Sequence, residues 1–144
     1  MAPRYRNPAL SVDAVWIRGG SVLLVRRGRP PFKGRWAFPG GFVGYYETVE
    51  EAIQREVREE TGLEIRPLGL VGVYSGPDRD PRHPTTSVVF FVTGAPRLPK
   101  GGDDAAEARW VPLKEARGLA FDHDRMLADA RRLRRTRRRP PTRS

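Results

Sequence analysis

The segment that most constrains the fold is residues 40–63, GGFVGYYETVEEAIQREVREETGL. Thr48 followed by Glu51 is the pattern of a capping box, in which side chains satisfy unpaired backbone donors at the start of a helix. Gly62 lies where the helix is expected to end, because glycine adopts the left-handed cap conformation without a Cβ penalty. The sequence therefore predicts a helix between Thr48 and Gly62.

The inward face of this helix changes from apolar to acidic along its length. Val49, Ala52 and Ile53 form one stripe at about 100° per residue. Glu56 and Glu60 continue that stripe, one turn apart. Carboxylates on a core-facing stripe repel one another and lose hydration, so they need hydrogen bonds, shifted pKa values or a cation. Oxygen ligands suit Mg²⁺ or Mn²⁺, so we expect one of these cations here.

The alternative is that residues 55–60, REVREE, form only a charged and solvated helix face. Helical periodicity places Arg55 and Arg58 opposite the apolar stripe, where a solvated face is expected. The position of Glu56 and Glu60 on the inward stripe nevertheless favours the cation site.

The residues at fixed positions of this segment are similar to a known family signature. Gly41, Glu47 and residues 55–63 (REVREETGL), at their present spacing, resemble a complete Nudix box. The resemblance implies the α/β Nudix fold, an α/β/α sandwich with a mixed β-sheet, in which the box forms a loop, a helix and a loop. It also implies metal-dependent hydrolysis of a nucleoside diphosphate linked to another moiety.

The resemblance also implies roles for individual residues of the box. By position, the metal ligands would be the Gly40 carbonyl, Glu56 and Glu60, with Glu59 beside them. Arg55 would orient these carboxylates through ion pairs.

The loop before Glu47 departs from the family pattern. Many members carry Glu at the position of Gly44 and Gly at that of Tyr46, so an unusual loop path is expected. This departure bears on substrate contacts more than on metal binding.

Proton removal from the attacking water has several candidate residues. Glu59 is one, and family members often place a second carboxylate on a loop opposite the box. In this chain Asp103, Asp104 and Glu107 lie in or beside such a loop, residues 100–106. The sequence leaves the choice between them open, and surface solvation is the alternative role for the loop acids.

The segment 76–84, GPDRDPRHP, is predicted to be a loop that contacts the substrate. The guanidinium groups of Arg79 and Arg82 suit phosphate or ribose oxygens. Pro77 falls fourteen residues after Leu63, a feature associated with the ADP-ribose pyrophosphatase branch of the family. We assign Pro77 and Phe42 to substrate binding together with these arginines.

Resemblance to this branch extends over roughly residues 8–130 and implies conversion of ADP-ribose to AMP and ribose 5-phosphate. One alternative is a Nudix enzyme for oxidised nucleoside triphosphates, dinucleoside polyphosphates or capped RNA. Another is a non-catalytic, ADP-ribose-sensing regulator that binds nucleic acid. Such regulators append a winged helix and often have a broken box, and because this chain shows neither feature we expect an enzyme.

The remaining sequence predicts the other elements of a single domain. Strands are expected at residues 9–17, 22–25, 68–75, 85–93 and 108–111, with a hairpin turn at 18–21. A short helix is expected at 112–117. A longer helix capped by Asp122 should pack through an apolar stripe formed by Met126, Leu127, Ala130 and Leu133. His123 is assigned a capping or packing role.

Charge divides the chain of 144 residues into a domain, 1–135, and an arginine- and proline-rich tail, 136–144. The net charge is +10, and eight of the 27 basic residues lie between Arg131 and Arg143. The other 19 basic residues nearly balance the 17 acidic ones. The tail is predicted to be a disordered, solvated end, with nucleic-acid binding as the alternative.

The composition also bears on location and partners. The chain has no cysteine, no apolar run of membrane-spanning length and no apolar core of a signal peptide near its start. We therefore expect a soluble cytoplasmic protein with a nucleotide-sugar substrate and no membrane partner. A homodimer is left open.

Overall fold

The computed structural model describes residues 6–102 and 105–138. The elements, in chain order, are β1 (Ala9–Val15), β2 (Ile17–Arg18), β3 (Ser21–Arg27), β4 (Trp36–Ala37), β5 (Gly40–Phe42), α1 (Val49–Thr61), β6 (Ile65–Tyr74), β7 (Thr85–Gly94), β8 (Ala105–Pro112), a 3₁₀ turn (Leu113–Glu115) and α2 (His123–Arg138).

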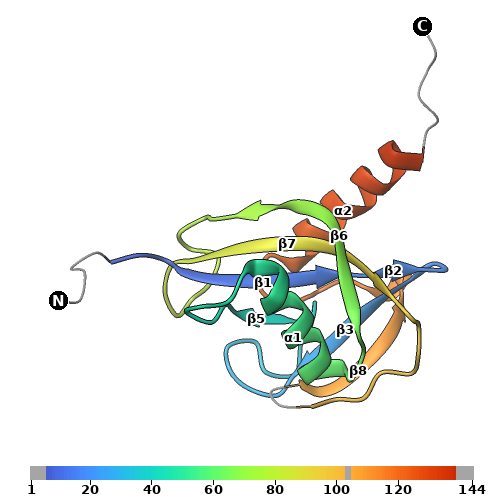
Figure 1. Cartoon of the computed structure of the whole chain (residues 1–144), viewed down its shortest axis with the longest axis horizontal. Coiled ribbons are helices and arrows are strands. Elements are labelled where there is room, and N and C mark those ends of the chain that lie inside the picture. The colour runs from blue at the N-terminus through green and yellow to red at the C-terminus, as the bar shows by residue number, and fades with distance from the viewer. Residues whose placement is uncertain (1–5, 103–104, 139–144) are drawn as a thin grey trace, which may run out of the picture.

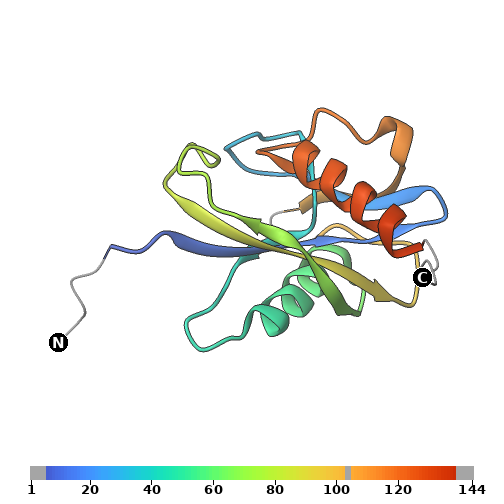
Figure 2. The same ribbon diagram turned by 90° about the horizontal axis from the view of Figure 1, so that it is seen from above.

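Within the described residues, the strands form two four-stranded sheets that lie between the helices. One sheet has the order β5-β1-β7-β6, and in the other β3 pairs with β2, β4 and β8. The β1–β7 pairing is parallel, whereas β1–β5 and β6–β7 are antiparallel. Helices α1 and α2 cover opposite faces (Figures 1 and 2). This confirms the predicted α/β architecture with a mixed sheet.

Helix α1 begins and ends where the sequence predicts. The Thr48 hydroxyl accepts a hydrogen bond from the Glu51 amide at 3.0 Å, and the Glu51 carboxylate accepts one from the Thr48 amide at 3.2 Å. Gly62 has φ of 74° and donates its amide to the Arg58 carbonyl. Local side-chain chemistry therefore fixes both ends of the helix.

Two apolar clusters hold the helices against the strands. Ala52, Ile53 and Val57 of α1 are fully buried against residues that include Val12 and Leu23. Met126, Leu127 and Ala130 of α2 pack in the second cluster, with Leu133 partly buried at its edge, as predicted. Residues 22–25 of β3 are buried on both faces, which confirms the interpretation of this apolar run.

Several predicted boundaries shift because strand pairing extends beyond the local pattern. The strand predicted over 9–17 is divided at Trp16 into β1 and β2. The strand predicted at 108–111 begins at Ala105, because its pairing with β3 continues through Glu107. Glu107 therefore lies in a strand and not beside a loop. The helix predicted at 112–117 is only a 3₁₀ turn.

Helix α2 extends into the region predicted to be a disordered tail. Residues 136–138 are helical, and residues 139–144 lie outside the described part of the chain. In the part of the chain that the structure describes, neither helix is long and apolar enough to cross a bilayer.

The cap of α1 gives a test of the fold by glycine substitution. Gly62→Ala places a Cβ at positive φ, which should lower the free energy of unfolding by about 1–2 kcal/mol. Gly76→Ala is the matched control, because a Cβ there meets open space at an ordinary φ, and a change below about 0.5 kcal/mol is expected. Urea denaturation measures both. Equal effects would contradict the assigned role of the cap.

Candidate active site

A cavity of about 480 Å³ lies where β1, β3, β5, α1, the loop 76–84 and the start of α2 meet. Most of the predicted site residues line it: Gly40, Phe42, Arg55, Glu56, Glu60, Arg79 and Arg82. Glu59, Pro77 and Glu107 are not among the residues that line it. The structure thus brings the box and the loop 76–84 together.

Arg55 organises the acidic side of the cavity. Its Nε and Nη2 donate to the two carboxylate oxygens of Glu47, both at 2.7 Å. Its Nη1 donates to Glu56 at 2.9 Å and to Glu59 at 3.1 Å, and Nη2 also donates to the Phe42 carbonyl. Hydrogen bonds from Arg55, and then from the Gly44 amide, lower the pKa of Glu47 to about 2. The guanidinium is therefore fixed as a charged, multidentate donor.

This position of Arg55 corrects the prediction from helical periodicity, which placed it on a solvated face. The side chain is long enough to run sideways from α1 to the box loop, and only 30% of it is exposed. The ion pairs themselves agree with the orienting role that the family resemblance implied.

The two acids of the inward stripe pack against the two glycines of the box. The Glu60 carboxylate accepts a hydrogen bond from the Gly40 amide at 3.0 Å. A Cβ on Gly41 would lie 2.5 Å from the carboxyl carbon of Glu56, so no larger residue fits there without displacing that carboxylate. Burial raises the pKa of Glu56, and the hydrogen bond from Arg55 opposes this rise.

These residues fit a hard divalent cation. Glu56 and Glu60 offer only oxygen, and the burial that raises the pKa of Glu56 would be offset by a bound cation. Within residues 6–102 and 105–138, no group of three or more acidic or histidine side chains is arranged to hold a metal ion. The remaining ligands would therefore be the Gly40 carbonyl, water and substrate phosphates, as is common for Mg²⁺.

The candidate proton acceptors differ in their surroundings. Glu59 is 39% exposed and is held by Arg55 beside Glu56. Glu107 instead forms ion pairs with Arg26 and Arg109 on the β3–β8 pair. Asp103 and Asp104 lie outside the described residues.

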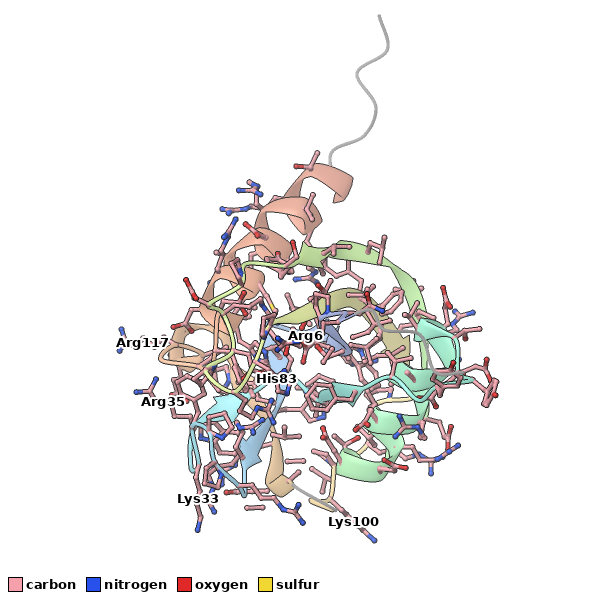
Figure 3. The ribbon with its side chains drawn as sticks, turned by 90° about the vertical axis from the view of Figure 1, so that its left-hand side faces the viewer. Arg6, Lys33, Arg35, His83, Lys100 and Arg117 are labelled. Atoms are coloured by element: carbon pink, nitrogen blue, oxygen red, sulfur yellow. The ribbon has the colours of Figure 1, made fainter. Side chains whose placement is uncertain are left out.

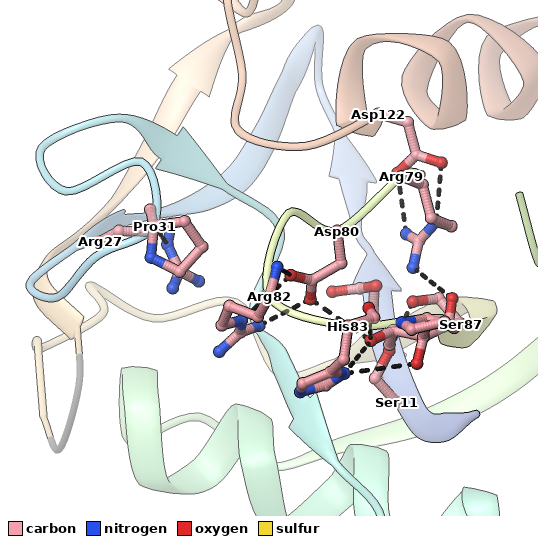
Figure 4. Close-up of polar contacts among 12 residues, drawn as sticks. Ser11, Arg27, Pro31, Arg79, Asp80, Arg82, His83, Ser87 and Asp122 are labelled. Atoms are coloured by element: carbon pink, nitrogen blue, oxygen red, sulfur yellow. Dashed lines mark hydrogen bonds and ion pairs between the residues drawn. The ribbon is translucent and has the colours of Figure 1, made fainter. Parts of the chain in front are cut away.

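The two arginines of the loop 76–84 have different partners (Figure 4). Arg79 donates from Nε and Nη2 to Asp122, at 2.9 and 2.8 Å, and from Nη1 to the Thr85 carbonyl. Its side chain is only 7% exposed, so all its nitrogens are used within the protein. Arg79 nevertheless lines the cavity, and its contact with the substrate stays a prediction. Asp122, predicted to cap α2, uses its carboxylate for this pair.

Arg82 retains donor capacity at the mouth of the cavity. Its Nε and Nη2 bind Asp80, which is buried, while the side chain of Arg82 is 38% exposed. Its guanidinium lies 5.3 Å from the centre of the Phe42 ring and 5.8 Å from that of Phe121. Of the two arginines, Arg82 is thus the one placed to contact a ligand. Pro77 is exposed and does not line the cavity, and its role in substrate binding stays a prediction.

Cations point into solvent along one margin of the face that Figure 3 shows. Lys33, Arg35 and Arg117 project outward at its margin, whereas His83 lies near its centre (Figure 3). His83 stands 5.9 Å from Phe42, ring centre to ring centre. Arg27 and Arg29 line the cavity itself, and neither was among the predicted site residues.

A buried polar pair in the cavity wall was also missed. Burial raises the pKa of Asp13 to about 7 and lowers that of His123 to about 3. The His123 Nε2 lies 3.7 Å from the Asp13 carboxylate. The available signal was a lone acid, Asp13, in a predicted strand whose next residues, Ala14, Val15 and Trp16, are all apolar. The packing role predicted for His123 agrees with its burial.

Comparisons with known proteins agree with this geometry. The NUDIX domain family model matches residues 7–130. The ADP-ribose pyrophosphatase of Methanocaldococcus jannaschii is 47% identical over 125 residues, which cover 87% of this chain and 74% of that protein.

Solved structures are similar over nearly the whole chain. The NUDIX domain of Shewanella oneidensis NrtR, complexed with ADP ribose, has a TM-score of 0.79 at 27% identity and covers 90% of both chains. A bifunctional NMN adenylyltransferase/ADP ribose pyrophosphatase from Francisella tularensis, complexed with AMP and an Mn ion, has a TM-score of 0.79 at 29% identity. It covers 91% of this chain, which spans only 43% of that protein. The family match over most of the chain confirms the predicted Nudix fold, and the chain belongs to the NUDIX domain family.

Proposed function

We propose that the chain is a divalent-metal-dependent hydrolase of a nucleoside diphosphate linked to another moiety, with ADP-ribose as the favoured substrate. The observation that carries this proposal is the packing of Glu56 and Glu60 on Gly40 and Gly41 within one cavity that also holds Arg82. The M. jannaschii relative, an ADP-ribose pyrophosphatase, supports the choice of substrate. Addition of water across one P–O bond of the diphosphate gives AMP and ribose 5-phosphate.

In the proposed mechanism Glu56, Glu60 and the Gly40 carbonyl hold the cation. A divalent cation held there would neutralise charge on the phosphate oxygens and would lower the pKa of the attacking water. Arg55 holds the carboxylate of Glu59 beside that of Glu56, at 3.1 and 2.9 Å from its Nη1. Glu59 is therefore preferred over Glu107 as the acceptor of the water proton.

The substrate contacts follow from the cavity mouth. Arg82 donates to a phosphate or ribose oxygen, because its guanidinium is partly exposed and is oriented by Asp80. The Phe42 ring, 41% exposed, offers an apolar surface beside it. Arg79 acts indirectly, by holding the loop 76–84 against Asp122.

Further assignments rest on the sequence. We propose Mg²⁺ as the physiological cation, with Mn²⁺ as a substitute. The cysteine-free composition supports a cytoplasmic, reducing compartment. Homodimer formation remains open. Nucleic-acid binding through the arginine-rich end of α2 remains the less favoured alternative to a small-molecule substrate alone.

A substrate panel tests the proposed function. With Mg²⁺, product chromatography should show AMP and ribose 5-phosphate from ADP-ribose. The kcat/KM should be at least about 10-fold above that for dGTP, 8-oxo-dGTP or diadenosine polyphosphates, the effect of one charge-assisted hydrogen bond of about 1.5 kcal/mol.

Glu60→Gln should lower turnover by about 100-fold or more, because preorganised charge at the reacting phosphate is lost.

The substrate panel and the Glu60→Gln variant could contradict the proposal in different ways. Faster hydrolysis of a triphosphate would remove the ADP-ribose assignment and leave the hydrolase assignment intact. Binding of ADP-ribose without hydrolysis, or full activity in Glu60→Gln, would remove the proposed catalytic role of the box.

Replacing each loop arginine by lysine separates the proposed substrate contact of Arg82 from the proposed structural role of Arg79. Arg82→Lys keeps a charge beside Asp80 but loses the planar donor fork, so KM for ADP-ribose should rise by about 10-fold with little change in stability. Arg79→Lys loses the bidentate bond to Asp122 and the bond to Thr85, and should lower the free energy of unfolding by about 1–3 kcal/mol. Steady-state kinetics and urea denaturation give both values. A rise in KM for Arg79→Lys that matches that of Arg82→Lys would show that Arg79 contacts the substrate.

A further inference from the structure

The backbone that carries Gly40 is bound by the first residue of α2. The Phe38 amide donates to Nδ1 of His123 at 3.1 Å, across 85 residues of sequence. The two rings also stack, with centroids 5.2 Å apart and planes inclined by 26°. Both residues are almost fully buried. The segment Phe38–Gly40 is therefore fixed from the α2 side through both its backbone and a side chain.

Asp13 fixes the same segment from the β1 side. Asp13 pairs with Gly40 in the antiparallel register of β1 and β5, and the Ala14 amide donates to the Pro39 carbonyl at 2.9 Å. A Cβ on Gly40 would lie 2.5 Å from Oδ1 of Asp13. The carboxylate of Asp13 is thus in direct contact with the Gly40 backbone.

Asp13 and His123 also face each other. Because Nδ1 of His123 accepts the Phe38 amide, the ring of the neutral imidazole carries its proton on Nε2. That nitrogen lies 3.7 Å from Oδ1 of Asp13. A hydrogen bond from the Ser87 side chain also reaches the Asp13 carboxylate and acts to lower its pKa. His123 and Asp13 therefore contact the segment Phe38–Gly40, which leads into the box, and also face each other.

Packing alone does not account for a buried acid and a buried histidine at this place. Burial of polar groups opposes folding unless they are well paired, and apolar residues of similar size commonly replace such pairs without loss of stability. The neighbouring residue Asp122 performs a comparable task, because it holds the loop 76–84 through Arg79. Two consecutive residues at the start of α2 thus hold two different walls of the cavity.

We propose that His123 and Asp13 are positioning residues for the cation site. They fix the backbone of Phe38–Gly40, so that the Gly40 amide meets Glu60 and the Gly40 carbonyl is held ready for the cation. This inference rests on the proposed function, since it requires that Gly40, Glu56 and Glu60 bind the metal. Groups that orient metal ligands commonly change metal affinity by about 10–100-fold when they are removed.

The test measures Mn²⁺ binding in the full chain, by electron paramagnetic resonance of free Mn²⁺ and without substrate. His123→Phe keeps a ring but removes the acceptor for the Phe38 amide, and should weaken Mn²⁺ binding by about 10-fold or more. His123→Asn places an amide oxygen near the position of Nδ1, and should restore most of the affinity. An unchanged Kd in His123→Phe would overturn the inference.

A matched control separates positioning from stability. Tyr74→Phe removes a 2.6 Å hydrogen bond to Asp129 of α2, distant in the chain from Gly40. It should lower Tm and leave the Kd for Mn²⁺ unchanged. If Tyr74→Phe weakens Mn²⁺ binding as much as His123→Phe does, general loosening of α2 explains the effect and the inference fails.

Glu56→Gln distinguishes this inference from the proposed function. Weaker Mn²⁺ binding in Glu56→Gln with unchanged binding in His123→Phe would overturn only the positioning role. Unchanged binding in Glu56→Gln would overturn the proposed cation site itself. If His123→Phe does not fold, Asp13→Asn replaces it, since it keeps the shape of the side chain but replaces one carboxylate oxygen beside the Gly40 backbone and His123 by an NH₂ group. Loss of affinity by about 10-fold is then expected, and an unchanged Kd overturns the inference.

Discussion

The rest of the site depends on the ion pairs of Arg55. Its guanidinium joins Glu47 and the Phe42 carbonyl of the box loop to Glu56 and Glu59 of α1. Without it, neighbouring carboxylates on one helix would repel each other and turn toward solvent. With it, the loop and the helix are held as one unit, and Glu56 is kept at the cavity even though burial raises its pKa. Fixed charges of this kind are what electrostatic catalysis requires.

The cavity wall formed by the loop 76–84 and the start of α2 is likewise held by side-chain hydrogen bonds and ion pairs. Arg79 and Asp122 bind across 43 residues, and His123 and Phe38 across 85, so the start of α2 is tied to two distant parts of the chain. The loop 76–84 is also stiffened internally by the pair of Arg82 with the buried Asp80. A cavity with walls held in this way loses little freedom when a ligand binds, which favours affinity and accurate placement of the reacting atoms.

What the sequence predicted well was local. The capping box at Thr48, the end of α1 at Gly62 and the apolar run of β3 depend on residues close in the chain, and the structure confirms them. The partners of Arg79 and of Asp13 depend on contacts made only after folding, so they could not be predicted. Periodicity also misplaced Arg55, because it describes the direction of a Cβ atom and not the reach of a long side chain.

The central claim is that Glu56, Glu60 and the Gly40 carbonyl hold a divalent cation in the cavity. The most direct measurement is an anomalous difference map from crystals grown with Mn²⁺, recorded at the manganese absorption edge. We expect a peak within about 2.6 Å of oxygens from Gly40, Glu56 and Glu60, the range for oxygen ligands of hard cations. A peak only at another place in the molecule, or no peak at saturating Mn²⁺, would contradict the claim.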